Sequence, residues 1–134
     1  MQEKGNAKCI NICALELLQE YRIITLRKSL RETVSSSKPK ALGAYERQIN
    51  FTKELIEVLL NNKKLGKKLY WIIYLTYMTK RQPEGIEEIL ENISEKIGRI
   101  PRSSYFRLRK RALEILDNHL SELSADDAQS YQYA

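Results

Sequence analysis

The sequence predicts an all-α protein, and three observations support this fold class. Apolar residues recur three and four positions apart through most of the chain, which is the spacing of one face of an α-helix. Only 5 Gly and 3 Pro occur among 134 residues, too few for the many tight turns of an all-β chain. With 43% hydrophobic and 30% charged residues the chain can bury a core, so we expect one compact domain, or one domain with an added arm.

The first predicted helix lies in an N-terminal helical arm or hairpin, residues 1–34. Its apolar stripe consists of Ile10, Ala14, Leu17, Leu18, Tyr21 and Ile24, continued by Leu26, Leu30 and Val34. Cys9 and Cys13 lie about one helical turn apart on the same side, which suits packing as small apolar residues better than a disulfide. The segment SSSKPKALG, residues 35–43, combines Ser, Lys, Pro and Gly, and we expect it to be a mobile linker.

Residues 44–124 are predicted to form a helical domain. Its first helix, over residues 45–64, has apolar positions that step by four and three. The run KKLYWIIYLTYMTKR that follows is rich in β-branched and aromatic residues, which alone favour a strand. Leu69, Ile72 and Ile73 also fit helical spacing, however, and in an otherwise helical chain we expect a buried helix.

Two further helices and a polar tail complete the predicted chain. The break Pro83-Glu84-Gly85 precedes a segment that is typical of one helix or two short ones and ends at Gly98, which suits a left-handed backbone. Pro101 stands where a new helix can begin, because proline is tolerated at the first helical position. The last helix is expected over residues 102–120, and a polar, frayed tail over residues 125–134.

The C-terminal part of this domain, about residues 86–120, has the pattern of a helix-turn-helix. A short helix is followed by the turn at Gly98 and then by a helix whose first turns are polar and basic. Tyr105, Leu108 and Ala112 are the positions expected to be buried, holding this second helix at a fixed angle. Its opposite face is then free to enter the DNA major groove.

Positive charge is concentrated in this predicted recognition helix. Between Arg99 and Arg111 there are six cations and no acid, and such a run can neutralise phosphates along the groove. Arg102 and Ser103 are placed to reach base edges, and Phe106 to meet a thymine methyl group. The predicted DNA-binding residues are Arg99, Arg102, Ser103, Ser104, Phe106, Arg107, Arg109, Lys110 and Arg111. The alternative is a solvated basic face of a bundle that never touches nucleic acid.

The other chemistry-bearing residues do not indicate an enzyme. His119 lies near Asp117, but no Ser or Cys nucleophile is placed with this pair. Because the sequence has neither a set of metal ligands nor a Gly-rich phosphate loop, we expect no catalytic residue, cofactor or metal. Four lysines either hold the DNA backbone or form a solubilising turn: Lys63, Lys64, Lys67 and Lys68. The aromatic residues after them are expected in the core rather than stacked on single strands: Tyr70, Trp71, Tyr74 and Tyr77.

Three stretches resemble known transcription factors. The string ISEKIG-R-IPRSSYFRLRKRALEIL resembles the signature of sigma-factor region-4-like modules, and WIIYLTYM resembles the helix that precedes it there. LELLQEYR and the charged helix after it are similar to small phage regulators of the ArpU and RinA type, which activate late operons in Gram-positive hosts. The resemblance implies a supporting helix and turn from Ile93 to Gly98 and a recognition helix from Pro101 to Arg111. Arg99 is an extra residue in the turn, and Pro101 replaces the usual serine cap.

Together these features predict a non-enzymatic, sequence-specific regulator of transcription that binds double-stranded DNA and is encoded by a phage or prophage. A homodimer through the N-terminal helices suits two half-sites about 34 Å apart, and RNA polymerase is a further expected partner. The alternative is a helical adaptor that binds RNA polymerase or a DNA-packaging partner. Since LYWIIYLTYM is half the length of a membrane span and no secretory signal is present, we expect the cytoplasm of a bacterial host and no membrane contact.

The net charge of +6 is distributed unevenly. Residues 1–81 hold 16 basic and 7 acidic groups, whereas residues 82–134 hold 7 and 10. The predicted DNA-binding part is therefore net acidic, and its interaction with DNA depends on the separation of its charges along the chain. The acidic segment 84–95 could contact a protein rather than DNA.

Overall fold

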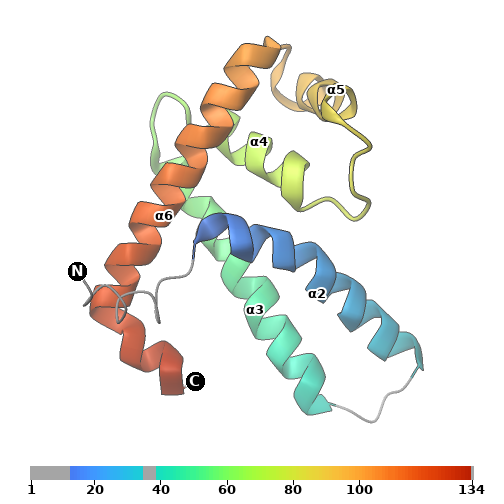
Figure 1. Ribbon diagram of the computed structural model, residues 1–134, viewed down its shortest axis with the longest axis vertical. Helices are drawn as coiled ribbons and strands as arrows, with labels where there is room; N and C mark the ends of the chain where they lie inside the picture. The colour runs from blue at the N-terminus through green and yellow to red at the C-terminus, as the bar shows by residue number, and fades with distance from the viewer. Residues whose placement is uncertain (1–12, 35–38, 134) are drawn as a thin grey trace, which may run out of the picture.

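The computed structural model describes residues 13–34 and 39–133, and every regular element in them is helical (Figure 1). In chain order the elements are α2 (Ala14–Val34), α3 (Pro39–Glu57), the 3₁₀ helix η1 (Val58–Asn61), α4 (Gly66–Tyr77), α5 (Ile86–Ile97) and α6 (Arg102–Tyr133). The predicted all-α fold class is confirmed.

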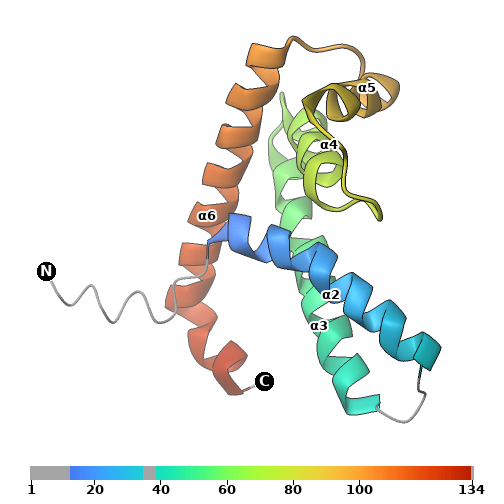
Figure 2. The same ribbon diagram turned by 45° about the vertical axis from the view of Figure 1, so that its right-hand side comes forward.

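Helices α2 and α3 form an antiparallel hairpin that packs on the rest of the chain (Figure 2). Gln48 Nε2 of α3 donates a hydrogen bond to Glu20 Oε1 of α2 at 3.1 Å. Helix α2 also contacts α4 and α6, and Arg22 Nη2 donates to Thr79 Oγ1, just beyond α4, at 3.0 Å. Burial lowers the pKa of the Arg22 guanidinium. The hairpin therefore shares one core with the helices that follow, and it is not a detached arm.

Helices α4, α5 and α6 form a three-helix unit in which α5 and α6 both pack against α4 (Figure 1). Leu69, Ile72 and Ile73 of α4 are fully buried, because α4 is covered by these helices and by the hairpin. The predicted helix is confirmed here, although its β-branched and aromatic residues favour a strand when they are considered alone. Burial against neighbouring helices outweighs that intrinsic preference.

The apolar stripe predicted for the first helix is only partly correct. Its first members in the described part are buried, from Ala14 to Ile24, but Leu26 and Leu30 are 57% and 62% exposed. They are exposed because Leu26 follows Ile24 by only two residues, which places Leu26 and Leu30 on the opposite side of α2, away from α3. Ile10 and Cys9 lie outside the described residues, and the same holds for the side chain of Val34.

The predicted linker and tail are both shorter than expected. Helix α3 already begins at Pro39, so residues 39–43 are helical, and residues 35–38 lie outside the described part. Proline at the first helical position lacks only an N–H that would have no partner there, which explains this start. Helix α6 continues to Tyr133 through the segment predicted to be a frayed tail, because no Gly or Pro interrupts it.

Two contacts between distant segments fix the helix ends. The backbone N–H of Ala14, the first residue of α2, donates to Asp117 Oδ1 of α6 at 2.7 Å. A carboxylate at this position satisfies a free N–H and interacts favourably with the helix dipole. At the start of α4, a Cβ added to Gly66 would lie 3.0 Å from the carbonyl oxygens of Leu59 and Leu60. Glycine therefore permits the close approach of η1 and α4.

Candidate nucleic-acid interface

A row of buried side chains fixes the first half of α6 in the core. Tyr105, Leu108 and Ala112 are all buried, as predicted, and Leu116 continues the row one turn later. The hydroxyl group of Tyr105 shares a 2.8 Å hydrogen bond with Thr76 Oγ1 of α4. Because this row occupies one side of the helix, it fixes the rotation of α6 about its axis and determines which residues face outward.

The outward side of α6 is exposed and positively charged over its first three turns. With 3.6 residues per turn, positions 103, 107 and 110 lie opposite the buried row. Ser103, Arg107 and Lys110 are all exposed, and Arg111 is exposed at the margin of this face. The next acidic residue along the helix is Glu114. We call Ser103, Arg107, Lys110 and Arg111 the basic face.

Two of the predicted arginines lie at the side of α6 and have partners within the protein. Arg102 Nη2 is 3.5 Å from Glu87 Oε2 of α5, and both side chains are exposed. The guanidinium carbon of Arg109, which is half-buried, lies 5.6 Å and 5.3 Å from the ring centroids of Tyr105 and Phe106. These are cation–π distances. Phe106 remains 43% exposed, on the edge of the basic face.

The turn before α6 has the backbone conformation that the sequence predicts at its glycine. Gly98 has a φ of 96°, which is the region that favours glycine. Arg99 follows it and is exposed, whereas Ser104, in the first turn of α6, is half-buried. Pro101 precedes the helix by one residue and its carbonyl oxygen accepts the N–H of Tyr105 at 3.0 Å. Pro101 therefore occupies the N-cap position of α6. Because its side chain has no hydrogen-bond acceptor, it cannot cap the helix as a serine would.

The outer face of α5 is acidic. Its exposed acids are Glu84, just before the helix, and Glu87, Glu91 and Glu95. Glu88 is held differently: its Oε1 accepts the backbone N–H of Glu84 at 2.8 Å, and its Oε2 pairs with Arg81. The backbone hydrogen bond and then the Arg81 guanidinium lower the pKa of the Glu88 carboxyl. The three-helix unit therefore carries negative charge on α5 and positive charge on α6.

Four exposed lysines lie in the turn between η1 and α4 and in the first turn of α4: Lys63, Lys64, Lys67 and Lys68. The side chain of Asn62 fixes this turn, since its Oδ1 accepts the backbone N–H of Leu65 at 2.8 Å. The preceding element, η1, packs against α6. The lysine cluster is thus attached to an element that touches α6.

The aromatic side chains of α4 pack against the core, as predicted. Tyr70, Trp71, Tyr74 and Tyr77 are half-buried. The rings of Tyr70 and Trp71 meet edge to face with centroids 5.3 Å apart, and Lys96 Nζ of α5 lies 5.0 Å from the Trp71 ring. Burial raises the pKa of the Tyr70 and Tyr77 hydroxyls. These contacts hold α4 to its neighbours.

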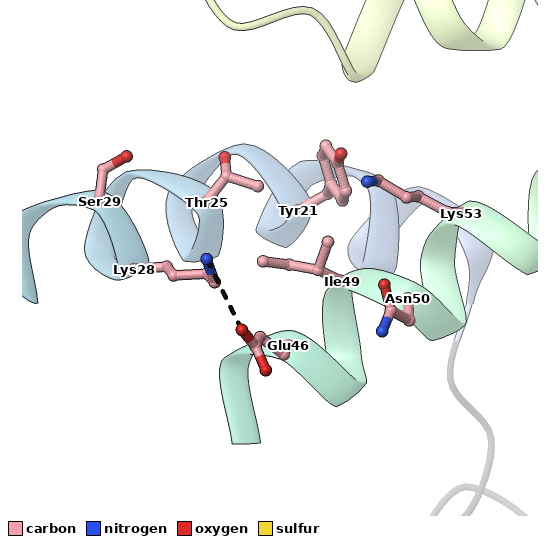
Figure 3. Close-up of a pocket in the computed structure, with 8 residues that line it drawn as sticks. All are labelled: Tyr21, Thr25, Lys28, Ser29, Glu46, Ile49, Asn50 and Lys53. Carbon is pink, nitrogen blue, oxygen red and sulfur yellow. Dashed lines mark ion pairs between the residues drawn. The ribbon is translucent and has the colours of Figure 1, made fainter. Parts of the chain in front are cut away.

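A polar groove that the sequence did not suggest lies between α2 and α3, with a volume of about 510 Å³ (Figure 3). Its lining residues are Tyr21, Thr25, Lys28, Ser29, Glu46, Ile49, Asn50 and Lys53. Lys28 Nζ is 3.8 Å from Glu46 Oε2 and 2.6 Å from Glu32 Oε2. The charge of Lys28 is therefore balanced within the hairpin, and the basic face of α6 remains the stronger candidate site.

Comparison of this chain with protein-family models, curated proteins and solved structures finds no match. Within the described residues, no group of three or more His, Cys, Asp or Glu side chains is placed to hold a metal ion. None of the described helices is long and apolar enough to span a membrane.

Proposed function

We propose that this protein is a non-enzymatic regulator of transcription that binds double-stranded DNA through the first half of α6. The observation that carries the proposal is the arrangement of α6: one side is buried in the core through Tyr105, Leu108 and Ala112, and the other is the exposed basic face. An α-helix of this width fits the major groove of B-DNA. A helix held on one side and charged on the other is what groove recognition requires.

Individual residues of α6 take different roles in this proposal. Arg107 and Lys110 point away from the core and are assigned to phosphates or base edges, with Ser103 one turn earlier as a further base contact. Arg102 contributes after it leaves Glu87, because their 3.5 Å pair is exposed and weak. Arg109 is assigned a structural role, because its guanidinium packs over the rings of Tyr105 and Phe106.

The proposed biological setting comes from the motif and its resemblance to phage regulators. A protein of this kind acts in the cytoplasm of a bacterial host, on operators in phage or prophage DNA. The acidic outer face of α5 is assigned to RNA polymerase, since negative charge next to the DNA-binding helix favours a protein partner over a phosphate backbone. A single recognition helix buries little surface, so two copies on two half-sites are proposed.

The experiment is a salt-controlled titration of a fluorescently labelled duplex of random sequence. The Arg107→Ala, Lys110→Ala double variant removes two proposed phosphate contacts. Its slope of log affinity against log salt should be smaller by about 1.8, and its affinity at 0.1 M salt lower by one to two orders of magnitude. The matched control, Arg47→Ala with Lys53→Ala, removes the same charge from exposed positions of α3. Equal losses in the two variants, with unchanged helicity, would contradict the proposed site.

A second candidate function is favoured by the acidic face of α5. In this alternative the protein is a helical adaptor that joins RNA polymerase or a DNA-packaging partner, and the basic face meets an acidic protein surface. The same titration separates the two functions, because the adaptor has no affinity for duplex DNA at moderate salt.

A further inference from the structure

Helix α2 carries a row of exposed apolar side chains that nothing in the described part of the chain covers. Ile23, Leu26 and Leu30 are 48%, 57% and 62% exposed. Their spacing of three and four residues places them on one side of the helix. This side lies opposite the one that faces the hairpin groove through Tyr21 and Lys28 (Figure 3). A continuous apolar row on a charged helix is typical of an interaction surface.

Charged residues beside this row differ between the two halves of α2. Glu20 is exposed in the first half, and Arg27 is exposed two turns later, so the two lie on the same side of the row. Glu20 has one carboxylate oxygen engaged by Gln48, at 3.1 Å, and its side chain still faces solvent. The row is therefore flanked by a negative charge near its start and a positive charge near its end.

We propose that the apolar row of α2 binds the same row of a second copy of this chain, with the two helices antiparallel about a twofold axis. In this register Ile23 packs against Leu26 of the second copy, and Glu20 lies beside Arg27 of the second copy. The twofold axis repeats both contacts, as in any isologous interface. In a parallel twofold pair the same side of the two rows would lie at opposite edges of the interface, so Glu20 of one chain could not reach Arg27 of the other. Only the antiparallel orientation brings these opposite charges together.

The size of this surface sets the expected strength of the dimer. Ile23 and Leu26 of each chain form the centre of this interface, with Leu30 at its edge. The interface is therefore smaller than the standard class, and the free protein should dimerise weakly, with a Kd in the micromolar range or above. The pairing involves no residue of the basic face and needs no DNA. It deepens the proposed function, on which the placement of two copies rests, and it is tested in the absence of DNA so that its failure and a failure of DNA binding can be told apart.

The first experiment is sedimentation equilibrium of the full chain over a wide range of concentration. The average mass of the unaltered protein should rise from 15.7 kDa toward twice that value. Leu26→Glu should remain monomeric throughout. The matched control is Leu60→Glu, which changes a leucine of similar exposure, 47%, on η1 and should dimerise like the unaltered protein. Far-ultraviolet circular dichroism confirms that both variants fold.

A charge exchange then tests the orientation and register. Glu20→Arg alone and Arg27→Glu alone each replace two attractive pairs with two repulsive ones, and each should weaken self-association about tenfold. Mixing these two variants should give a heterodimer, and the Glu20→Arg, Arg27→Glu double variant should dimerise again with near-original affinity. A protein that stays monomeric at all concentrations would overturn the proposal. Single variants that associate undiminished, or a mixture that does not associate, would overturn it as well.

Discussion

Replacing Gly98 with alanine tests how the turn before α6 is built. Gly98 has φ 96° and ψ 168°, a region of backbone space that is essentially restricted to glycine. An added Cβ would meet nothing within 4 Å, so the cost of Gly98→Ala is torsional alone. Holding alanine in such a conformation costs about 1–3 kcal/mol. The lower entropy of the unfolded alanine variant offsets about 0.4–1 kcal/mol of this, which leaves a net loss of stability of about 1–2 kcal/mol.

Gly85→Ala is the matched control, because it lies at the other end of α5. Gly85 has a φ of −178°, an extended conformation that any residue adopts, and its Cβ position is also open. Here only the entropy effect remains, so Gly85→Ala should leave stability unchanged or raise it by up to about 1 kcal/mol. Urea unfolding followed by circular dichroism measures both variants, from the shift in midpoint at a constant slope. If the two variants have the same stability, the assigned turn conformation is refuted.

Three further predictions concern the helix ends and the α5 carboxyl. Asp117→Asn keeps an acceptor for Ala14 but removes a charge from the start of α2, and it should lower stability by about 0.3–1 kcal/mol in thermal unfolding. Gly66→Ala forces its Cβ against two carbonyl oxygens and should lower stability by about 1–2 kcal/mol in the same assay. Glu88 should titrate below its ordinary pKa by carboxyl NMR, and Arg81→Ala should raise that pKa. Because the folded-state pKa of Glu88 is lowered, its stabilising contribution is present above the unfolded-state pKa and is lost as the pH falls through the folded value.

Helical periodicity predicted much of the fold because burial in a helical protein repeats with the helix. Leu69, Ile72 and Ile73 identified α4, and Tyr105 with Leu108 identified the buried side of α6. In both segments the apolar residues face neighbours within the same chain, so pattern and burial agree. The left-handed turn at Gly98 was predicted for a different reason, because few other residues adopt a positive φ.

The prediction failed where an apolar pattern had no partner within the same chain. Leu26 and Leu30 are four residues apart, as in a helical stripe, but Leu26 follows Ile24 by only two residues, so both leucines lie on the opposite side of α2 and are exposed. Periodicity shows that a helix has an apolar side, but it does not show whether α3, another helix or a second molecule covers that side. The start of α3 at Pro39 was missed because proline and serine favour both a linker and the first turn of a helix.

In the candidate site, too, the sequence predicted the segment but not the role of each residue. The sequence showed a run of cations after Gly98. It could not show which of these side chains face solvent and which bind other residues of the protein. Arg102 pairs with Glu87, which lies 15 residues earlier on another helix, and this depends on how α5 and α6 both pack on α4. Arg107 and Lys110 are free of such partners in the described contacts, because α6 is rotated with Tyr105 inward.

Helix α6 connects the two surfaces that the proposals assign. Its first three turns carry the basic face, and its middle part holds the start of α2 through Asp117 and packs in the core through Leu116 and Leu120. The exposed apolar row lies farther along α2, beyond the part that this contact fixes. The proposed recognition of DNA and the proposed pairing of two chains therefore use separate side chains on one shared core. A dimer built through α2 would thus leave both basic faces exposed, as the proposed binding to two half-sites requires.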